Sequence, residues 1–167
     1  MSIINNLKLE HRLVNMDSNI LEIFKKIGHI LTNDNRPLTH DFMIKLVDKL
    51  GLPEYYVQGS LETLKNYDYI SYGEHASGGI YNIKLTGCGI ITYCVNFMEE
   101  SDSIFDDISS EILYNCPCTN ESISEKLDVP RPIVNAVIDY FHMKRYIDMQ
   151  KTASDTRTIY RVLIRVK

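Results

Sequence analysis

The stretch EKLDVPRPIV (residues 125–134) places two prolines between segments whose apolar residues recur at helical spacing. A shift of 77 positions brings the earlier stretch DKLGLPEYYV (residues 48–57) into register with it. Four aligned pairs are identical: Lys49 and Lys126, Leu50 and Leu127, Pro53 and Pro130, and Val57 and Val134. The register continues with apolar residues of similar size: Leu61 with Ile138, Leu64 with Phe141, Tyr69 with Tyr146, and Ile70 with Ile147. A shared register of this length predicts a tandem repeat of one domain type.

The first copy has the pattern of three helices followed by a β-hairpin. The predicted helices cover residues 17–31, 39–51 and 53–66, and the predicted strands cover residues 69–73 and 80–85. Apolar residues on one face mark the first helix, and Thr39 and Gly51 are good end signals for the second. Pro53 suits the first turn of the third helix, where the missing N–H has no helical partner. Alternating residues on both sides of the small-residue turn EHASGG indicate the hairpin.

The second copy repeats this plan. Its predicted helices cover residues 103–114, 119–127 and 130–144, and its predicted strands cover residues 146–151 and 157–167. The two prolines of the opening stretch therefore lie at the turn of a helix-turn-helix and in the first turn of the next helix. The sequence predicts an α+β, mostly α, fold of two winged helix-turn-helix domains in tandem. The predicted boundaries are an N-terminal helical extension over 1–16, a first domain with a following apolar helix over 17–98, and a second domain over 99–167.

Charge is distributed unevenly along the 167 residues, whose formal net charge is −4. Residues 99–125 contain eight acidic residues and no Lys or Arg, whereas residues 126–167 contain nine basic residues and four acidic ones. The C-terminal segment is therefore basic within an acidic chain, which favours a nucleic-acid partner for that segment. No stretch is apolar for long enough to span a bilayer, and the N-terminus lacks a signal-peptide pattern, so we expect a cytoplasmic protein with no membrane partner.

Three stretches resemble winged helix-turn-helix transcriptional regulators of the MarR and PadR kinds. They are LKNYDYISYG (64–73), YNIKLTGCG (81–89) and CTNESISEKLDVPRPIVNAVIDYFHMKRYI (118–147), and the resemblance extends over about nine tenths of the chain. It implies a DNA-binding transcriptional regulator. It also implies a homodimer through terminal helices such as residues 1–16, although apolar residues at helical spacing there fit a helix packed on its own domain equally well. The apolar helix over 86–98 is a second candidate dimer interface, or it lies between the two domains.

The second copy is the better candidate for binding double-stranded DNA. Its third helix and hairpin offer the following side chains: Arg131, Asn135, His142, Lys144, Arg145, Lys151 and Arg157. Arg and Asn read base edges in the major groove, and Lys and Arg contact phosphates. The last strand should direct Tyr160 and Val162 into the core and Arg161 outward. The same helix of the first copy is a poor DNA reader, because it exposes two carboxylates, on Glu54 and Glu62, beside Tyr55, Gln58 and Lys65.

No catalytic, metal-binding or cofactor-binding pattern is present in the sequence. Cys88 and Cys94 are six positions apart on a predicted helix, a poor match for metal ligands, although Cys116 and Cys118 are close together. The histidines are scattered and no phosphate-binding glycine loop follows a strand. We therefore expect no enzyme activity, no cofactor and no metal, and cysteines that fill apolar space.

Two functions remain open. One is a DNA-binding transcriptional regulator whose second winged helix reads DNA. The other is a protein–protein assembly module, because tandem winged helices also occur in chromosome-condensation complexes, endosomal sorting complexes and RNA polymerase subunits. The acidic 99–125 segment and the acidic third helix of the first copy favour the assembly module, and the basic C-terminal segment favours the regulator.

Overall fold

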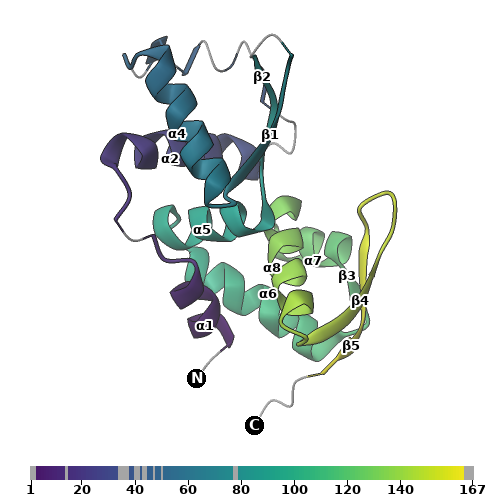
Figure 1. Ribbon diagram of the computed structural model, residues 1–167. Coiled ribbons are helices and arrows are strands. Elements are labelled where there is room, and N and C mark those ends of the chain that lie inside the picture. Colours follow the sequence, from purple (N-terminus) through teal and green to yellow (C-terminus); the bar gives the residue numbers. More distant parts are fainter. Residues whose placement is uncertain are drawn as a thin grey trace. The chain divides into compact units, whose positions relative to one another are not determined.

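The computed structural model shows an α+β chain that is mostly helical (Figure 1). It describes residues 3–13, 15–33, 38–39, 42, 45–46, 48–49, 51–76 and 79–163. Within that part it contains seven helices and five strands, arranged in two compact units. We call Arg12–Phe97 the N-terminal unit, and Met98–Lys167 together with Met1–His11 the C-terminal unit. No helix among the described residues is long and apolar enough to cross a membrane.

The N-terminal unit contains three described helices and one hairpin. Its elements are α2 (Ser18–Asn33), α4 (Glu54–Asn66), β1 (Ile70–Glu74), β2 (Ile80–Leu85) and α5 (Gly87–Phe97). Six of the thirteen residues of the helix predicted over 39–51 lie outside the described residues, and the described positions from Phe42 to Lys49 are helical. The core takes Phe24 and Ile27 from α2 and Leu61 and Leu64 from α4, all with no exposed surface. This burial follows from apolar residues recurring every three or four positions.

Helices α2 and α5 approach each other closely at Gly28. A Cβ added at Gly28 would overlap the ring of Tyr93, so only glycine leaves room for this ring. Tyr93 and Phe24 then meet edge to face, with ring centroids 6.5 Å apart. The small residue in α2 thus allows an aromatic side chain of α5 to complete the core.

The described residues of the C-terminal unit form four helices and a three-stranded sheet. Its elements are α1 (Ile3–Glu10), α6 (Ser101–Asn115), β3 (Cys118–Thr119), α7 (Asn120–Leu127), α8 (Arg131–Met143), β4 (Ile147–Lys151) and β5 (Arg157–Val162). The strand order is β3-β5-β4, with antiparallel pairing. Helix α1 belongs to this unit despite its place in the sequence: Leu7 is fully buried, and Lys8 and Glu10 form ion pairs with Asp102 of α6 and Lys144.

The repeat predicted from the sequence recurs in the backbone. Helices α4 and α8, strands β1 and β4, and strands β2 and β5 begin and end 77 positions apart. The two hairpins share one register, since Ile70 faces Leu85 where Ile147 faces Val162, and each contains an irregularity after its second residue. Asp68 and Arg145, also 77 positions apart, both have φ of 59° between helix and strand.

The turn in the opening stretch is built from local signals. Helix α7 starts with a capping box, in which Thr119 and Ser122 exchange hydrogen bonds, and it ends at Asp128 with φ of 53°. Pro130 then caps α8, whose first turn holds Pro132. A left-handed residue and a proline at these positions end one helix and start the next.

Strand β5 corrects one prediction. Tyr160 is 54% exposed, whereas Ile159 is fully buried. The reason is a bulge: Asp148 pairs with Arg161 and Met149 with Ile159, so Tyr160 is an extra residue and the alternation of faces shifts there. The end of the predicted strand, residues 164–167, lies outside the described residues.

Candidate functional site: the helix–hairpin grooves

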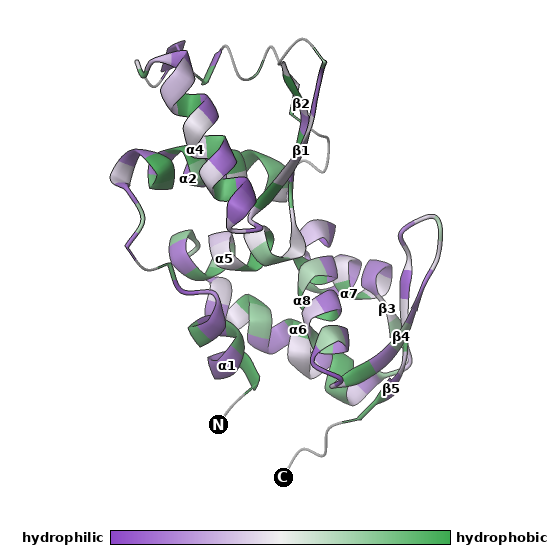
Figure 2. Ribbon diagram, viewed as in Figure 1, coloured by the Kyte–Doolittle hydropathy of each residue, from purple (hydrophilic) through white to green (hydrophobic). Residues whose placement is uncertain are grey.

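A groove runs between α4 and the β1–β2 hairpin of the N-terminal unit. Its volume is about 440 Å³. The groove is lined by Tyr55, Gln58, Gly59, Glu62, Lys65, Asn66, Tyr72, Glu74 and Ile80. Tyr55 is 76% exposed, and hydrophilic residues are frequent along α4 (Figure 2). We call this hollow the N-terminal groove.

The N-terminal groove is acidic and already holds one cation. Lys65 Nζ lies 3.1 Å from Glu74 Oε1 and 4.1 Å from the ring centroid of Tyr72. The hydrogen bond with Glu74 raises the pKa of Lys65, so the amine stays charged. Glu62 is exposed and forms no ion pair with any residue in the described part of the chain. The groove therefore offers tyrosine side chains and a carboxylate, Glu62, whose charge acts on Lys65 without a direct ion pair.

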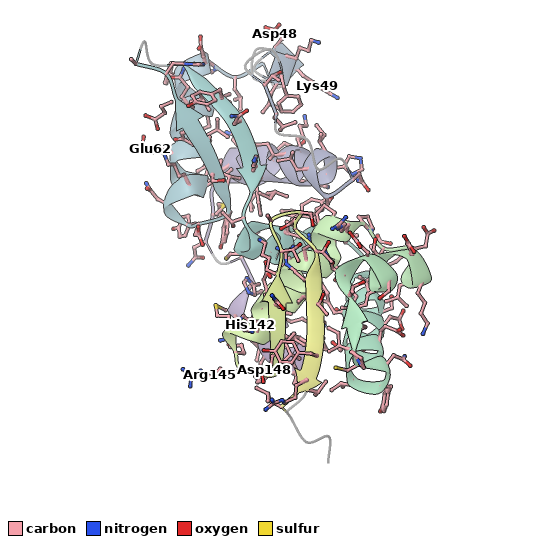
Figure 3. All side chains as sticks on the ribbon, turned by 90° about the vertical axis from the view of Figure 1, so that its right-hand side faces the viewer. Asp48, Lys49, Glu62, His142, Arg145 and Asp148 are labelled. Carbon is pink, nitrogen blue, oxygen red and sulfur yellow. The ribbon has the colours of Figure 1, made fainter. Side chains whose placement is uncertain are left out.

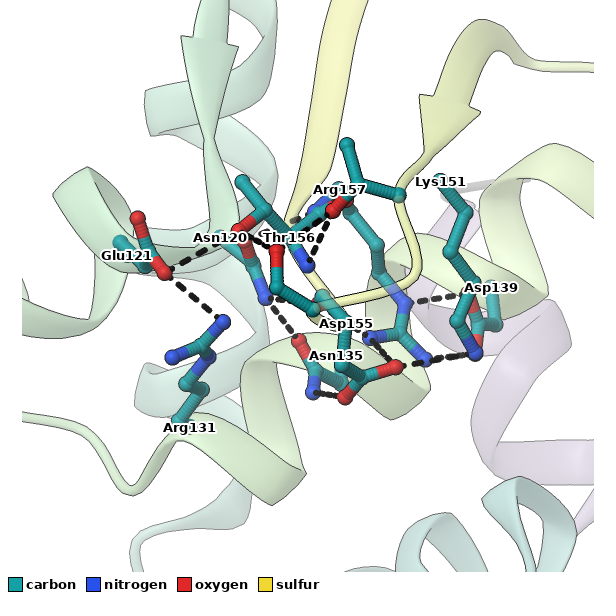
Figure 4. A network of polar contacts seen from close by, with 11 residues as sticks. Asn120, Glu121, Arg131, Asn135, Asp139, Lys151, Asp155, Thr156 and Arg157 are labelled. Carbon is teal, nitrogen blue, oxygen red and sulfur yellow. Dashed lines mark hydrogen bonds and ion pairs between the residues drawn. The ribbon is translucent and has the colours of Figure 1, made fainter.

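The same position in the C-terminal unit is closed by a polar network (Figure 4). Arg157, at the start of β5, is 4% exposed and extends over α8. Its Nε and one terminal nitrogen each donate to an oxygen of Asp139 at 2.7 Å, and its other terminal nitrogen lies 3.0 Å from Asp155 Oδ1. Burial alone would lower the pKa of Arg157, but hydrogen bonds and charge attraction from Asp139 and Asp155 leave it above its ordinary value. Two carboxylates thus compensate one buried guanidinium.

Two asparagines extend this network into the helices. The side chain of Asn120 is fully buried and donates to Asn135 Oδ1 at 2.6 Å and to the Asp155 carbonyl at 3.1 Å. The Asn120 side-chain oxygen accepts from the Arg157 backbone N–H at 2.9 Å, and Asn135 donates to Asp155 Oδ2 at 3.1 Å. Helices α7 and α8 are therefore joined to the β4–β5 hairpin by satisfied buried polar groups.

The repeat explains why one groove is open and the other closed. Ile80 occupies the position 77 residues before Arg157, and Glu62 occupies the position 77 residues before Asp139. We call the position between α8 and the β4–β5 hairpin, which Arg157 fills, the C-terminal groove. An isoleucine at the start of β2 cannot supply such a guanidinium to the N-terminal groove. The sequence prediction missed Ile80, Tyr72 and Glu74 as groove residues; the 77-residue alignment pairs Ile80 with Arg157, but the groove itself depends on the packing of the hairpin against α4.

The seven residues predicted to contact DNA differ in their exposure and in their ion pairs. Asn135 and Arg157 are buried in the network, so they are not presented to a duplex; their polar atoms are used inside the unit. Three more are paired at the surface: Arg131 with Glu121 at 2.9 Å, Lys144 with Glu10 at 2.8 Å, and Lys151 with Asp155 at 3.0 Å. His142 and Arg145 are exposed, and Arg145 forms no ion pair with the described residues (Figure 3).

A second hollow of about 530 Å³ lies along α2. Apolar Ile30, Phe42 and Leu46 form its floor, and Lys25, Lys26, His29, Lys45 and Lys49 surround it together with Glu22. Lys26 pairs with Glu22 at 3.4 Å. This hollow is the most basic surface among the described residues of the N-terminal unit.

Two of the four cysteines, Cys94 and Cys118, are buried, whereas Cys88 and Cys116 are only partly buried. None of the four, all of them in the described part, forms a disulfide bond. Burial raises the pKa of Cys94 to about 12 and that of Cys118 to about 11, so both are protonated thiols at neutral pH. Among the described residues, no three His, Cys, Asp or Glu side chains gather as metal ligands would.

The comparisons with known proteins give no family for this chain. No protein-family model matches it, and no curated protein is significantly similar to it.

Proposed function

We propose that this chain is an assembly module, built from two winged-helix units in tandem, which binds a partner protein through the N-terminal groove. The tandem winged-helix architecture is supported by the order of helices and hairpin in each unit and by the 77-residue correspondence of α4, β1 and β2 with α8, β4 and β5. The function is supported by the chemistry of the groove.

The observation that carries the proposal is the contrast between the two grooves. The C-terminal groove is filled by the chain's own Arg157, whereas the N-terminal groove is open and lined by exposed Tyr55. Tyrosine is enriched in protein interfaces, where it supplies a large contact area at low entropic cost. Carboxylates of Glu62 and Glu74 outnumber the one amine of Lys65 in the groove, so a phosphate backbone would be repelled.

A second candidate function is DNA binding by the C-terminal unit. It is favoured by the exposed His142 and Arg145, and by Lys144 and Lys151, whose carboxylate partners are at the surface. Exposed ion pairs contribute little to stability, so DNA phosphates can replace those carboxylates as partners of the two lysines. Burial of Asn135 and Arg157 removes two of the seven predicted contacts, which is why we place this function second.

Site-directed crosslinking tests the assembly proposal. A photoreactive benzophenone amino acid would replace Tyr55 in the full chain expressed in its source cells, and adducts would be identified by mass spectrometry. We expect a protein adduct from position 55 that is lost when Glu62→Lys reverses the charge of the groove. Position 114 is the matched control, because Tyr114 is 74% exposed but lies on α6 of the other unit.

Duplex binding provides the opposing test. Fluorescence anisotropy of the purified chain with random-sequence duplex DNA would be measured across a salt series. Steeply salt-dependent binding, with no protein adduct from position 55, would overturn the assembly proposal in favour of DNA binding.

A further inference from the structure

The C-terminal unit shows how a helix–hairpin groove of this type holds a guanidinium. Arg157 places its planar head group against α8, where Asp139 accepts two parallel hydrogen bonds at 2.7 Å. The Arg157 side chain is 5% exposed, and Asp155 accepts a further contact at 3.0 Å. This paired geometry is specific to arginine, because lysine has a single point charge.

The N-terminal groove has the same framework without that side chain. Helices α4 and α8 have equivalent bounds, and Glu74 faces Ile80 in the hairpin where Lys151 faces Arg157. Glu62 therefore stands at the position of Asp139, and Gln58 at the position of Asn135. The helix carboxylate that binds the guanidinium in one unit is present in the other, whereas the arginine is not, and the sequence has Gly78 at the position of Asp155.

The remaining wall of the N-terminal groove suits a cation. Lys65 already lies over the Tyr72 ring at 4.1 Å, and Tyr55 is exposed one helical turn before Gln58 and Gly59. A guanidinium bound to Glu62 would lie in a hollow that Tyr55 and Tyr72 also line, and arginine stacks on aromatic faces where they are accessible. Glu74 pairs with Lys65 at 3.1 Å, so Glu62 is the groove carboxylate that forms no ion pair within 4 Å among the described residues.

We propose that an arginine side chain of the partner protein occupies the N-terminal groove and pairs with Glu62, in the position that Arg157 takes in the C-terminal unit. This inference rests on the proposed assembly function and names the chemistry that the partner must present. The partner segment carries an exposed arginine, and a lysine in its place binds more weakly.

The first experiment uses a small probe in place of the partner. N-acetyl-arginine amide would be titrated into the isotope-labelled full chain and followed by backbone amide NMR shifts. We expect saturable shifts in α4 and the β1–β2 hairpin, with affinity about fivefold greater than for N-acetyl-citrulline amide, the uncharged analogue of similar shape. N-acetyl-lysine amide should fall between them. Glu62→Gln should remove the preference for arginine, whereas Glu54→Gln should leave most of it.

The second experiment supplies the arginine from within the chain. Ile80→Arg places a guanidinium at the start of β2, where Arg157 lies in β5. We expect this variant to fold, to lose the shifts caused by the arginine probe, and to lose the protein adduct at position 55. Adding Glu62→Gln to Ile80→Arg should restore access to the groove, because the new arginine loses its acceptor.

The outcomes separate the arginine inference from the assembly proposal. If arginine and citrulline probes bind equally, or if Glu62→Gln has no effect on the arginine preference, the arginine occupant is overturned. A protein adduct that persists in that case leaves the assembly function standing. If the arginine probe binds at Glu62 but no protein adduct forms at position 55, the groove chemistry stands and the assembly function falls.

Discussion

Arg157 and Asp139 form a two-pronged ion pair that joins the first residue of β5 to α8, with both N···O distances at 2.7 Å. The Arg157 side chain is 5% exposed and the Asp139 side chain 41% exposed, so the pair lies at the edge of the core. Removing one partner of such a pair costs more than the pair itself contributes, because a partly desolvated charge is left without compensation.

Arg157→Ala should therefore destabilise the C-terminal unit. We expect the free energy of unfolding to fall by about 2–4 kcal/mol. This is less than is usual for a fully buried pair, because Asp139 keeps access to water. The chain has no tryptophan, so urea unfolding would be followed by circular dichroism together with hydrogen exchange of the β4–β5 hairpin. Arg161→Ala is the control: Arg161 is 66% exposed and lies 3.5 Å from Asp148, so its loss should change stability by less than about 0.5 kcal/mol. Equal effects of the two substitutions would show that the network does not stabilise the unit.

Acidification should loosen the β4–β5 hairpin through Asp155. Burial alone would raise the pKa of Asp155, but hydrogen bonds from Lys151 and Arg157 outweigh it and leave the pKa below its ordinary value. A carboxyl whose folded pKa is depressed stabilises the fold above its unfolded pKa of about 3.9, and this contribution is lost as pH falls through the folded value. Hydrogen exchange, corrected for its intrinsic pH dependence, should show hairpin protection decreasing below about pH 4. Asp155→Asn should lack this acid-dependent change; if it shows the same decrease, another group is responsible.

Two glycine substitutions should have opposite effects on the stability of the N-terminal unit. Gly28→Ala forces the buried ring of Tyr93 to move, and we expect a cost of about 1–3 kcal/mol from overpacking. Gly59→Ala, on exposed α4 with no atom near its added Cβ, should stabilise by about 0.5–1 kcal/mol through helix propensity. Position 136, which is 77 residues later, is already alanine. Thermal unfolding would measure both, and a stabilising Gly28→Ala would contradict the close approach of α2 and α5.

Removing the anchor of α1 should weaken the C-terminal unit and leave the N-terminal unit intact. Leu7 is fully buried there, and Leu7→Ala should cost about 2–5 kcal/mol. Hydrogen exchange should rise in α6 and α8 but not in α2. Leu9→Ala, at a position 58% exposed on the same helix, should change little. Faster exchange in α2 alone would mean that α1 stabilises the other unit.

Charge substitutions should distinguish the two candidate functions on DNA. If the C-terminal unit binds a duplex, Arg131→Ala combined with Arg145→Ala should weaken binding by about tenfold and lower the salt slope, because each lost phosphate contact releases about one counterion fewer. Glu62→Ala should leave such binding equal or slightly tighter. Substitution of Lys25, Lys45 and Lys49 tests whether the basic hollow on α2 contributes. If the chain binds a duplex and none of these substitutions changes the affinity, neither of these two surfaces contacts the DNA.

Much of the backbone could be predicted from periodicity and from the repeat. The bounds of α8 and of both hairpins follow from apolar spacing and prolines, which are local signals, and from the 77-residue register, which is visible in the sequence alone. Strand β3 was missed because two residues are too few to show alternation. Similarly, apolar spacing predicted a helix near the N-terminus but could not show that α1 joins the C-terminal unit, which depends on contacts across more than 90 positions.

The site could be predicted only in part, because the direction of a charged side chain depends on its tertiary partners. From the sequence, Arg157 is expected to be a hairpin residue that contacts phosphate, yet its side chain is buried and paired with Asp139 and Asp155. Asn135 has the appearance of a base-reading side chain, yet Asn120 and Asp155 satisfy it inside the unit. The sequence predicts that Tyr55 and Glu62 are exposed and that the Glu62 carboxylate disfavours DNA, but the groove beside them required the hairpin to be placed against α4.

The two hairpins have the same strand lengths, the same pairing register and the same bulge. Backbone hydrogen bonds therefore cannot distinguish β2 from β5 as the neighbour of β4, and a chain with two such hairpins is exposed to strand exchange during folding, within one molecule or between two. The short connection between Lys151 and Arg157 favours β5, and side chains add to that preference. Strand β5 brings Arg157 to Asp139, whereas β2 in its place would bring Ile80 and leave that carboxylate without its cation. The ion pair between Arg157 and Asp139 thus also favours β5 over β2 as the strand that completes the sheet.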